Sequence, residues 1–157
     1  QAHHRGQSII EQRVPETDLL SLWESATSYK TRPSLGLDIG QSVNVNAKGL
    51  LANWLSCCDT LKQAFTIFHE NIALLNESES WSFKEQSQRV KFSFAFKSKY
   101  TYPVMATERS MVALIAWAEH FTSSKLDVHS AKFTFDKPGY YAKYEAIFGP
   151  NISVRIG

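Results

Sequence analysis

The side chains of this sequence that could bind a small molecule are a histidine, an arginine and several phenylalanines at regular spacing. A ligand pocket needs apolar walls and a few polar groups that fix the orientation of the ligand. An arginine among them favours a carboxylate or another anion, because its guanidinium donates charge-assisted hydrogen bonds. These side chains could therefore line a ligand pocket. The candidate residues are Phe65, Phe68, His69, Phe92, Phe94, Arg109 and Ile115.

Each of these side chains also has a purely structural explanation. Phenylalanines are common fillers of a hydrophobic core, and Arg109 could lie in solvent at the start of a helix. His69 belongs to an amphipathic stretch, where a half-buried, hydrogen-bonded histidine and a haem or metal ligand are both open interpretations. The sequence alone does not choose between a pocket and a filled core.

Catalytic motifs are absent from the sequence. It contains no GxSxG nucleophile turn, no phosphate-binding glycine loop and no HExxH zinc motif. Glu108 and Glu119 are too far apart along one predicted helix to act as a carboxylate pair. Cys57 and Cys58 are adjacent, which disfavours a disulfide between them, and they are expected to be free, buried thiols. We therefore expect neither an enzyme nor a bound cofactor or metal.

The charge of the chain argues against nucleic acid as a direct partner. The 157 residues carry 17 basic and 15 acidic side chains, which are interspersed and leave a net charge of +2. Specific DNA binding usually needs a clustered basic face. No apolar run approaches the roughly 20 residues that span a bilayer. The expected class is a cytoplasmic globular protein with no membrane segment and no specific DNA binding of its own.

Helical spacing dominates the first half of the chain. Residues 1–13 are polar and predict a flexible arm, and residues 14–157 predict one domain. Apolar residues at helical spacing predict a helix after Pro15, a short helix opened by Pro33 and ended by Gly40, and a third from residue 49. Asp59 or Thr60 suits the N-cap of a fourth helix that continues to residue 75.

The spacing then changes to that of strands. Residues 80–98 predict a hairpin with its turn near 85–88, in which Phe92, Phe94 and Phe96 share a deeply buried face. A helix at 104–121, a strand at 131–135, a helix ended by Gly149 and a last strand follow. The predicted fold is α+β: N-terminal helices and then a ββαβαβ unit, with helices packed on a mostly antiparallel sheet. If these residues line a pocket, it is expected between the helices at 60–75 and 104–121 and the hairpin.

The order of several short motifs adds a resemblance to a known family. The motifs are Pro15 before Leu19, Leu22 and Trp23; Leu35, Gly36, Leu37 and Gly40; Gly49, Leu50 and Leu51; Thr60, Leu61, Ala64 and Phe65; and Phe133, Phe135, Pro138, Tyr144, Phe148 and Gly149. From residue 13 to 156 the chain resembles the N-terminal regulatory, arabinose-binding-like domain of AraC-type transcription regulators. The resemblance implies a bacterial regulator whose DNA-binding domain, with two helix-turn-helix motifs, follows the last strand and is absent from this chain.

Two functions follow from the resemblance and stay open. The first is a domain that senses an unknown small effector, forms a homodimer and modulates promoter binding by the DNA-binding domain. The second is a protein-interaction and dimerisation domain that binds no effector. The helix at 104–121 has more apolar surface than one core side needs. That surplus either forms the dimer interface or packs inside the monomer.

Overall fold

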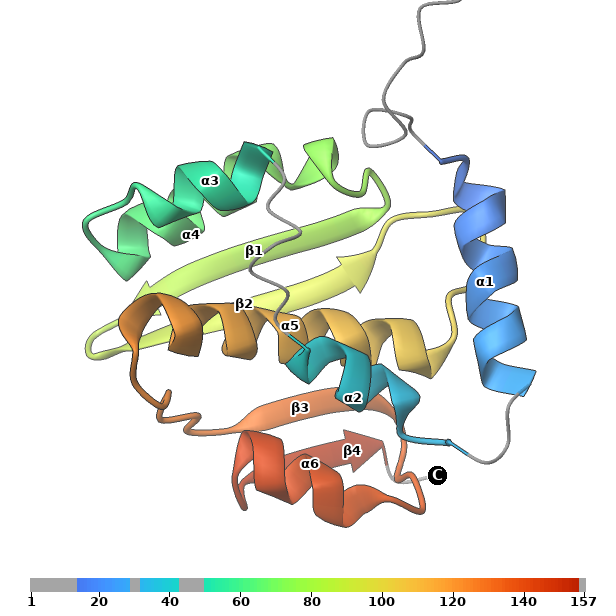
Figure 1. The fold of residues 1–157 in the computed structure, drawn as a ribbon. Coiled ribbons are helices and arrows are strands. Elements are labelled where there is room, and N and C mark those ends of the chain that lie inside the picture. The colour runs from blue at the N-terminus through green and yellow to red at the C-terminus, as the bar shows by residue number, and fades with distance from the viewer. Residues whose placement is uncertain (1–13, 29–31, 43–49, 156–157) are drawn as a thin grey trace, which may run out of the picture.

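The fold is that of an α+β domain, as predicted. The computed structural model describes residues 14–28, 32–42 and 50–155, so the predicted arm at 1–13 lies outside the described residues. The α+β class and the ββαβαβ order are confirmed (Figure 1). The elements are α1 Glu16–Ser28, α2 Leu35–Gln41, α3 Leu50–Ser56, α4 Leu61–Asn71, the 3-10 helix η2 Ile72–Leu74, β1 Glu79–Gln86, β2 Arg89–Phe96, α5 Val104–Thr122, β3 Ala131–Asp136, α6 Tyr141–Phe148 and β4 Ile152–Arg155.

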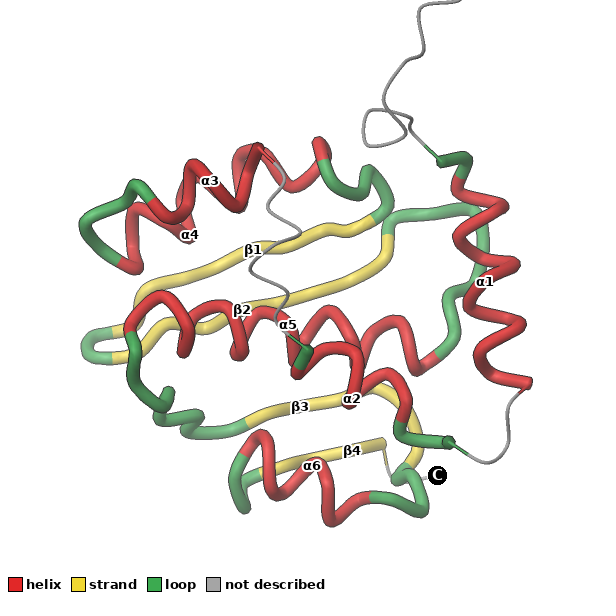
Figure 2. The backbone as a smooth tube through the Cα atoms, viewed as in Figure 1, coloured by secondary structure: helices red, strands yellow, loops and turns green. Residues whose placement is uncertain are grey.

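The strands pair as two separate ribbons within the described residues, and not as one sheet (Figure 2). β1 and β2 form an antiparallel hairpin whose register runs from Glu79 opposite Phe96 to Gln86 opposite Arg89. β3 and β4 are parallel, and α6 is the crossover between them. Sequence patterning located the strands, but the pairing of β4 with β3 depends on how α6 packs.

The hairpin shows the predicted alternation, but its apolar face is not deeply buried. Phe92, Phe94 and Phe96 are half-buried, and the intervening side chains are exposed. Val90, on the same face, is 46% exposed, and only Trp81 of β1 is fully buried. The expectation of a deeply buried face is therefore wrong, because its phenylalanines are only half-buried and Val90 near the turn is exposed.

Helix ends follow local chemistry at two of the predicted positions. The Thr60 hydroxyl accepts from the Gln63 backbone N–H, and the Gln63 side chain accepts from the Thr60 N–H, so Thr60 forms a capping box. Gly149 ends α6 with a φ of 77°, a region that favours glycine. Gly40, predicted to end its helix, instead lies inside α2.

Gly36 and Gly40 bring α2 into close contact with α5. A Cβ atom added at Gly36 would lie 2.4 Å from the Met105 carbonyl oxygen. One added at Gly40 would lie 2.7 Å from the Val112 Cβ. These glycines are required by packing, because the two helix backbones approach too closely for any side chain between them.

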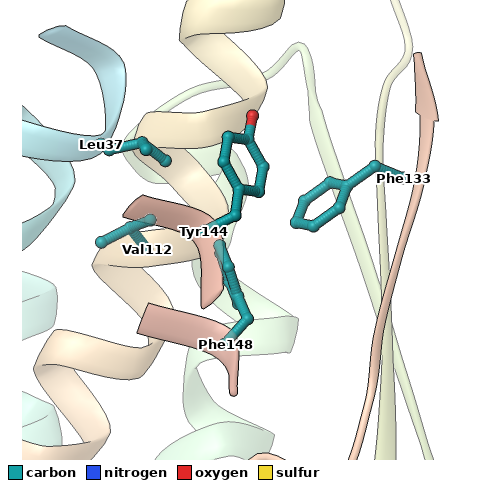
Figure 3. Close-up of a cluster of buried hydrophobic side chains, with 5 residues drawn as sticks. All are labelled: Leu37, Val112, Phe133, Tyr144 and Phe148. Carbon is teal, nitrogen blue, oxygen red and sulfur yellow. The ribbon is translucent and has the colours of Figure 1, made fainter. Parts of the chain in front are cut away.

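The core lies where α2, α5, α6 and β3 meet. Tyr144 packs between Leu37 and Phe133, and its ring meets that of Phe133 edge to face at a centroid distance of 5.1 Å (Figure 3). Phe148 and Val112 complete the buried cluster. One set of apolar contacts thus holds α2 and α5 to the neighbouring pair β3 and α6.

α5 runs through the middle of the molecule, and neighbouring elements cover most of it (Figure 1). From Met105 to Ala118 every side chain is buried or half-buried except Arg109. This packing supports the alternative in which the apolar surplus of α5 is used within the monomer. In the described part of the chain, no helix is long and apolar enough to cross a membrane.

Alanine substitution tests the close helix contact. Alanine is favoured over glycine in a helix by about 1 kcal/mol, but here the added methyl meets atoms that cannot move freely. We expect Gly36→Ala and Gly40→Ala each to lower the free energy of unfolding by about 1–3 kcal/mol, measured by urea denaturation. Gly139→Ala is the control, because nothing lies within 4 Å of its added Cβ. An unchanged midpoint for both helix variants would contradict the packing argument.

Candidate functional site

Five of the seven residues predicted to form a pocket lie together in the aromatic layer between α4 and the hairpin. The ring centroids of Phe65 and Phe92 are 4.5 Å apart, and His69 meets Phe83 edge to face at 5.7 Å. Phe68 and Phe94 both contact Trp81. The side chains therefore fill the interface by touching one another. His69 is exposed at its edge.

Arg109 lies at a different contact, between α5 and the start of β1. Its Nη1 is 3.6 Å from Oε1 of Glu79, whose side chain is only 7% exposed. The same carboxylate accepts from the Ser110 hydroxyl at 2.9 Å and from the Trp81 indole N–H at 3.0 Å. An anionic ligand at Arg109 would have to compete with this carboxylate.

Ile115 packs against the core of α2, α5, α6 and β3 and lines a cavity of about 130 Å³ there. The cavity lies between the end of α2, the second half of α5 and the end of α6. Its lining residues are Gln41, Val112, Ile115, Ala116, Glu119, Lys125, Ala146 and Ile147. Ile115 is thus the member of the predicted set that borders this space.

The cavity combines an aliphatic wall with a polar rim. The half-buried Ile115 and Ile147 supply the wall, while Glu119 and Lys125 bring opposite charges. Oε1 of Glu119 accepts from the Leu126 backbone N–H at 3.1 Å, which holds its carboxylate in place. Such a combination suits a small polar molecule with a short apolar part.

A buried carboxyl group lies further along the same face of α5. Glu108 has no exposed surface, and its Oε1 accepts from the hydroxyl of Tyr140 at 2.6 Å and from the hydroxyl of Tyr144. Its Oε2 has no hydrogen-bond partner among the described residues. Burial is the main cause that raises the pKa of Glu108 above its ordinary value, and the charge of Asp38 raises it further. The hydrogen bonds from Tyr140 and Tyr144 act in the opposite direction and lower it. The carboxyl group of Glu108 therefore ties α5 to α6 through the two tyrosine hydroxyls.

Burial also changes the pKa of the two tyrosines that bind Glu108. Desolvation, followed by the hydrogen bond to Glu108, raises the pKa of both Tyr140 and Tyr144, so both remain hydroxyl donors. The nearby Lys143 ammonium binds the Ser34 hydroxyl at 2.6 Å and the Asp38 carboxylate at 3.2 Å. Two polar connections therefore hold α6: one to α5 through Glu108 and one to α2 through Lys143.

The sequence reading missed Glu108 and the rim of the cavity. Glu108 precedes Val112 by four residues and Ile115 by seven, which places it on the core face of α5. That spacing was the available signal, since an acidic residue on an apolar face needs polar partners. The sequence gives no signal for the rim residues, because the position of the cavity depends on where α2, α5 and α6 meet.

Metal and thiol chemistry gain no support from the described residues. No group of three or more His, Cys, Asp or Glu side chains there could hold a metal ion. Cys57 is exposed and Cys58 half-buried, both as free thiols, so the expectation that the pair is buried is wrong. The Sγ of Cys58 contacts the Trp54 carbonyl oxygen at 3.5 Å.

A polar-rimmed cavity between packed helices is a common form of small-molecule site, and the fold and site together indicate a binding domain. Comparison with protein families defines it further. The model of the arabinose-binding domain at the N-terminus of AraC transcription regulators matches residues 7–155. The chain belongs to this family of regulatory domains, which is not an enzyme family. No curated protein matches the chain significantly.

Replacing the buried acid by its amide tests its protonation. Below its ordinary pKa of 4.5, Glu108 is protonated in the folded and unfolded chain alike. As the pH rises from there, the unfolded chain loses the proton first, so stability falls until the folded pKa is passed. At pH 8 we expect Glu108→Gln to have a higher unfolding temperature than the parent and a free energy of unfolding larger by on the order of 1 kcal/mol. This gain in stability should vanish near pH 4.

The control for this experiment is Glu145→Gln, an exposed residue of α6. It should show no such pH-dependent gain when both variants are compared by thermal denaturation at several pH values. A Glu108→Gln variant that is less stable than the parent by the same amount at every pH would show that burial does not raise the pKa of this carboxyl group.

Proposed function

We propose that this chain is the effector-sensing and dimerisation domain of an AraC-type transcription regulator. In this proposal a small molecule binds in the cavity between α2, α5 and α6 and alters how the regulator's DNA-binding domain engages its promoter. In this proposal the regulator is bacterial, as the AraC-type class implies, and it is cytoplasmic, because a bacterial promoter lies in the cytoplasm. The family match supports the regulatory class.

The observation that carries the effector proposal is the position of the cavity. Gln41 at the end of α2, Ile115 of α5 and Ile147 of α6 all border it. A ligand in this space contacts three helices at once and therefore favours one arrangement of them over others. A ligand alters an equilibrium only through such differential contacts.

The aromatic layer around Phe94, with Arg109 beside it, remains the second location for the effector. Its rings contact one another, and Arg109 already faces Glu79. A ligand there would have to separate these groups. The cavity needs no such rearrangement, so we propose that the effector binds there. The aromatic layer is the alternative site that the test below must exclude.

A ligand-free interaction domain is the second candidate, and exposed apolar side chains favour it. Leu22 is 66% exposed, Leu74 51% and Leu75 62%. Leu74 and Leu75 are adjacent at the end of η2, whereas Leu22 lies on α1, and a patch of exposed apolar residues can mark a partner surface. In this alternative the small cavity is a packing defect, and the domain acts only through protein contacts.

Blocking the cavity from its exposed edge distinguishes these possibilities. Ala146 lines the cavity and is exposed, so Ala146→Phe should fill it with little cost to folding. Ala142, also exposed on α6, is not among the lining residues and provides the matched control Ala142→Phe. Small polar metabolites, L-arabinose included because the family description names it, are screened by thermal shift and confirmed by calorimetry.

An effector at about a hundredfold excess over its Kd should stabilise the parent by about 2.7 kcal/mol. We expect Ala142→Phe to keep this stabilisation and Ala146→Phe to lose it. Loss in Phe94→Ala and Arg109→Ala, with Ala146→Phe unaffected, would move the site to the aromatic layer. A screen in which no metabolite stabilises the parent would favour the ligand-free alternative.

Self-association is tested on the chain itself. We expect sedimentation equilibrium across micromolar concentrations to show a homodimer. Its interface is expected among the exposed apolar residues and not on α5, whose central part is covered within the monomer. Leu75→Glu, which puts a charge on one of these residues, should then weaken the dimer, and Lys91→Glu on β2 is the control. A monomer at every concentration would contradict the dimerisation proposal for this chain.

A further inference from the structure

We propose that the effector of the cavity is a small zwitterion with the chemistry of an amino acid, whose ammonium group faces Glu119 and whose carboxylate faces Lys125. This inference rests on the proposed function, because it names the ligand class of the same cavity. Four features of the described residues carry it: two unpaired opposite charges, the end of a helix, an aliphatic wall and a small volume.

The two charges on the rim are complementary but do not neutralise each other. Glu119 and Lys125 both line the cavity, and no ion pair joins them, although such pairs form elsewhere among the described residues, as between Lys143 and Asp38. Glu119 is fixed through Leu126, while Lys125 makes no ion pair or hydrogen bond in the described part. Two opposite charges that line one cavity without pairing match a ligand that carries both signs.

The end of α6 strengthens the preference for an ammonium group. Ala146 and Ile147 border the cavity in the last turn of this helix. The carbonyl of Ala146 would ordinarily accept from the residue four positions on, which is Pro150 and has no N–H. Carbonyl groups at a helix C-terminus carry partial negative charge and attract cations. α5 ends on the same side of the molecule as α6 (Figure 1).

The size of the cavity limits the ligand. Its volume of about 130 Å³ is close to the roughly 150 Å³ of an engineered cavity that holds benzene. By that comparison the ligand has about six to eight non-hydrogen atoms. The half-buried Ile115 and Ile147 offer a small apolar wall for a short aliphatic side chain. Alanine, serine and valine fit these limits, whereas a pentose is larger and has no charge for either rim residue to pair.

Calorimetric titration with matched probes tests the ligand class. The probes are L-alanine, L-serine and L-valine, with isobutylamine and 3-methylbutanoate as analogues of valine that each lack one charged group. We expect the best amino acid to bind at least about tenfold more tightly than either single-charge analogue, because each of those leaves one rim charge unpaired. Equal affinity of valine and one analogue would overturn the zwitterion proposal.

Charge-removing variants assign each end of the ligand. Glu119→Gln keeps the oxygen that accepts from Leu126, and Lys125→Met keeps the length of the side chain. Each should weaken binding of the amino acid about tenfold or more. Glu119→Gln should leave 3-methylbutanoate binding unchanged, and Lys125→Met should leave isobutylamine binding unchanged. Lys91→Met, an exposed change on β2, is the control and should alter none of these affinities.

The outcomes separate this inference from the proposed function. Binding of L-arabinose or another uncharged metabolite that Ala146→Phe abolishes, but that Glu119→Gln and Lys125→Met do not change, would overturn the zwitterion and leave the effector proposal intact. Failure of all three amino acids to bind the parent would also overturn it. Failure of every metabolite in the screen would instead reject the effector proposal itself.

Discussion

The close contact between α2 and α5 is the constraint on which the rest of the structure depends. Two glycines one helical turn apart let the backbones approach, and Leu37 between them is completely buried. The position of α2 then determines where its last residue, Gln41, meets the cavity and where Ser34 and Asp38 meet Lys143 of α6. A shift of this one short helix would disturb the core, the cavity and the polar contacts of α6 together.

One face of α5 connects these features in sequence. Glu108, Val112, Ile115 and Glu119 recur at steps of four, three and four residues, so they lie along one side of the helix. The stripe begins at a buried acid held by two tyrosines, passes through the apolar core and ends at the rim of the cavity. A molecule in the cavity therefore contacts the same rigid element that carries the polar link to α6.

Sequence patterning predicted the kinds of element well and their contacts less well. Residues that recur at helical or strand spacing, such as Phe92, Phe94 and Phe96, identify an element and its apolar face without knowledge of its partner. Spacing does not predict which strands pair. The strands form two separate ribbons, and three-dimensional packing determines this arrangement. Gly40 illustrates the difficulty. From the sequence, a glycine near the end of a short helix suits a C-cap as well as it suits a close contact with another helix.

The candidate site was predictable only in part, for a similar reason. Aromatic periodicity correctly grouped Phe65, Phe68 and Phe92, but it does not reveal whether their rings enclose a space or touch. Ile115 was chosen as a wall residue of a different pocket, and the structure places it beside the cavity at the helix ends. Lys125 lies in a polar loop with no periodicity, so only the meeting of α2, α5 and α6 gives it a role.

The pairing of α2 with α5 also bears on how the chain reaches its folded state. β3, α6 and β4 are contiguous in sequence, and their contacts close over short loops. α2 precedes its partner by the whole of α3, α4 and the hairpin, so this contact closes a long loop, which is slow to form. During synthesis Leu37 has no cover until α5 has left the ribosome. The nascent chain therefore exposes the apolar side chains of this segment until α5 emerges, which leaves them open to aggregation during synthesis.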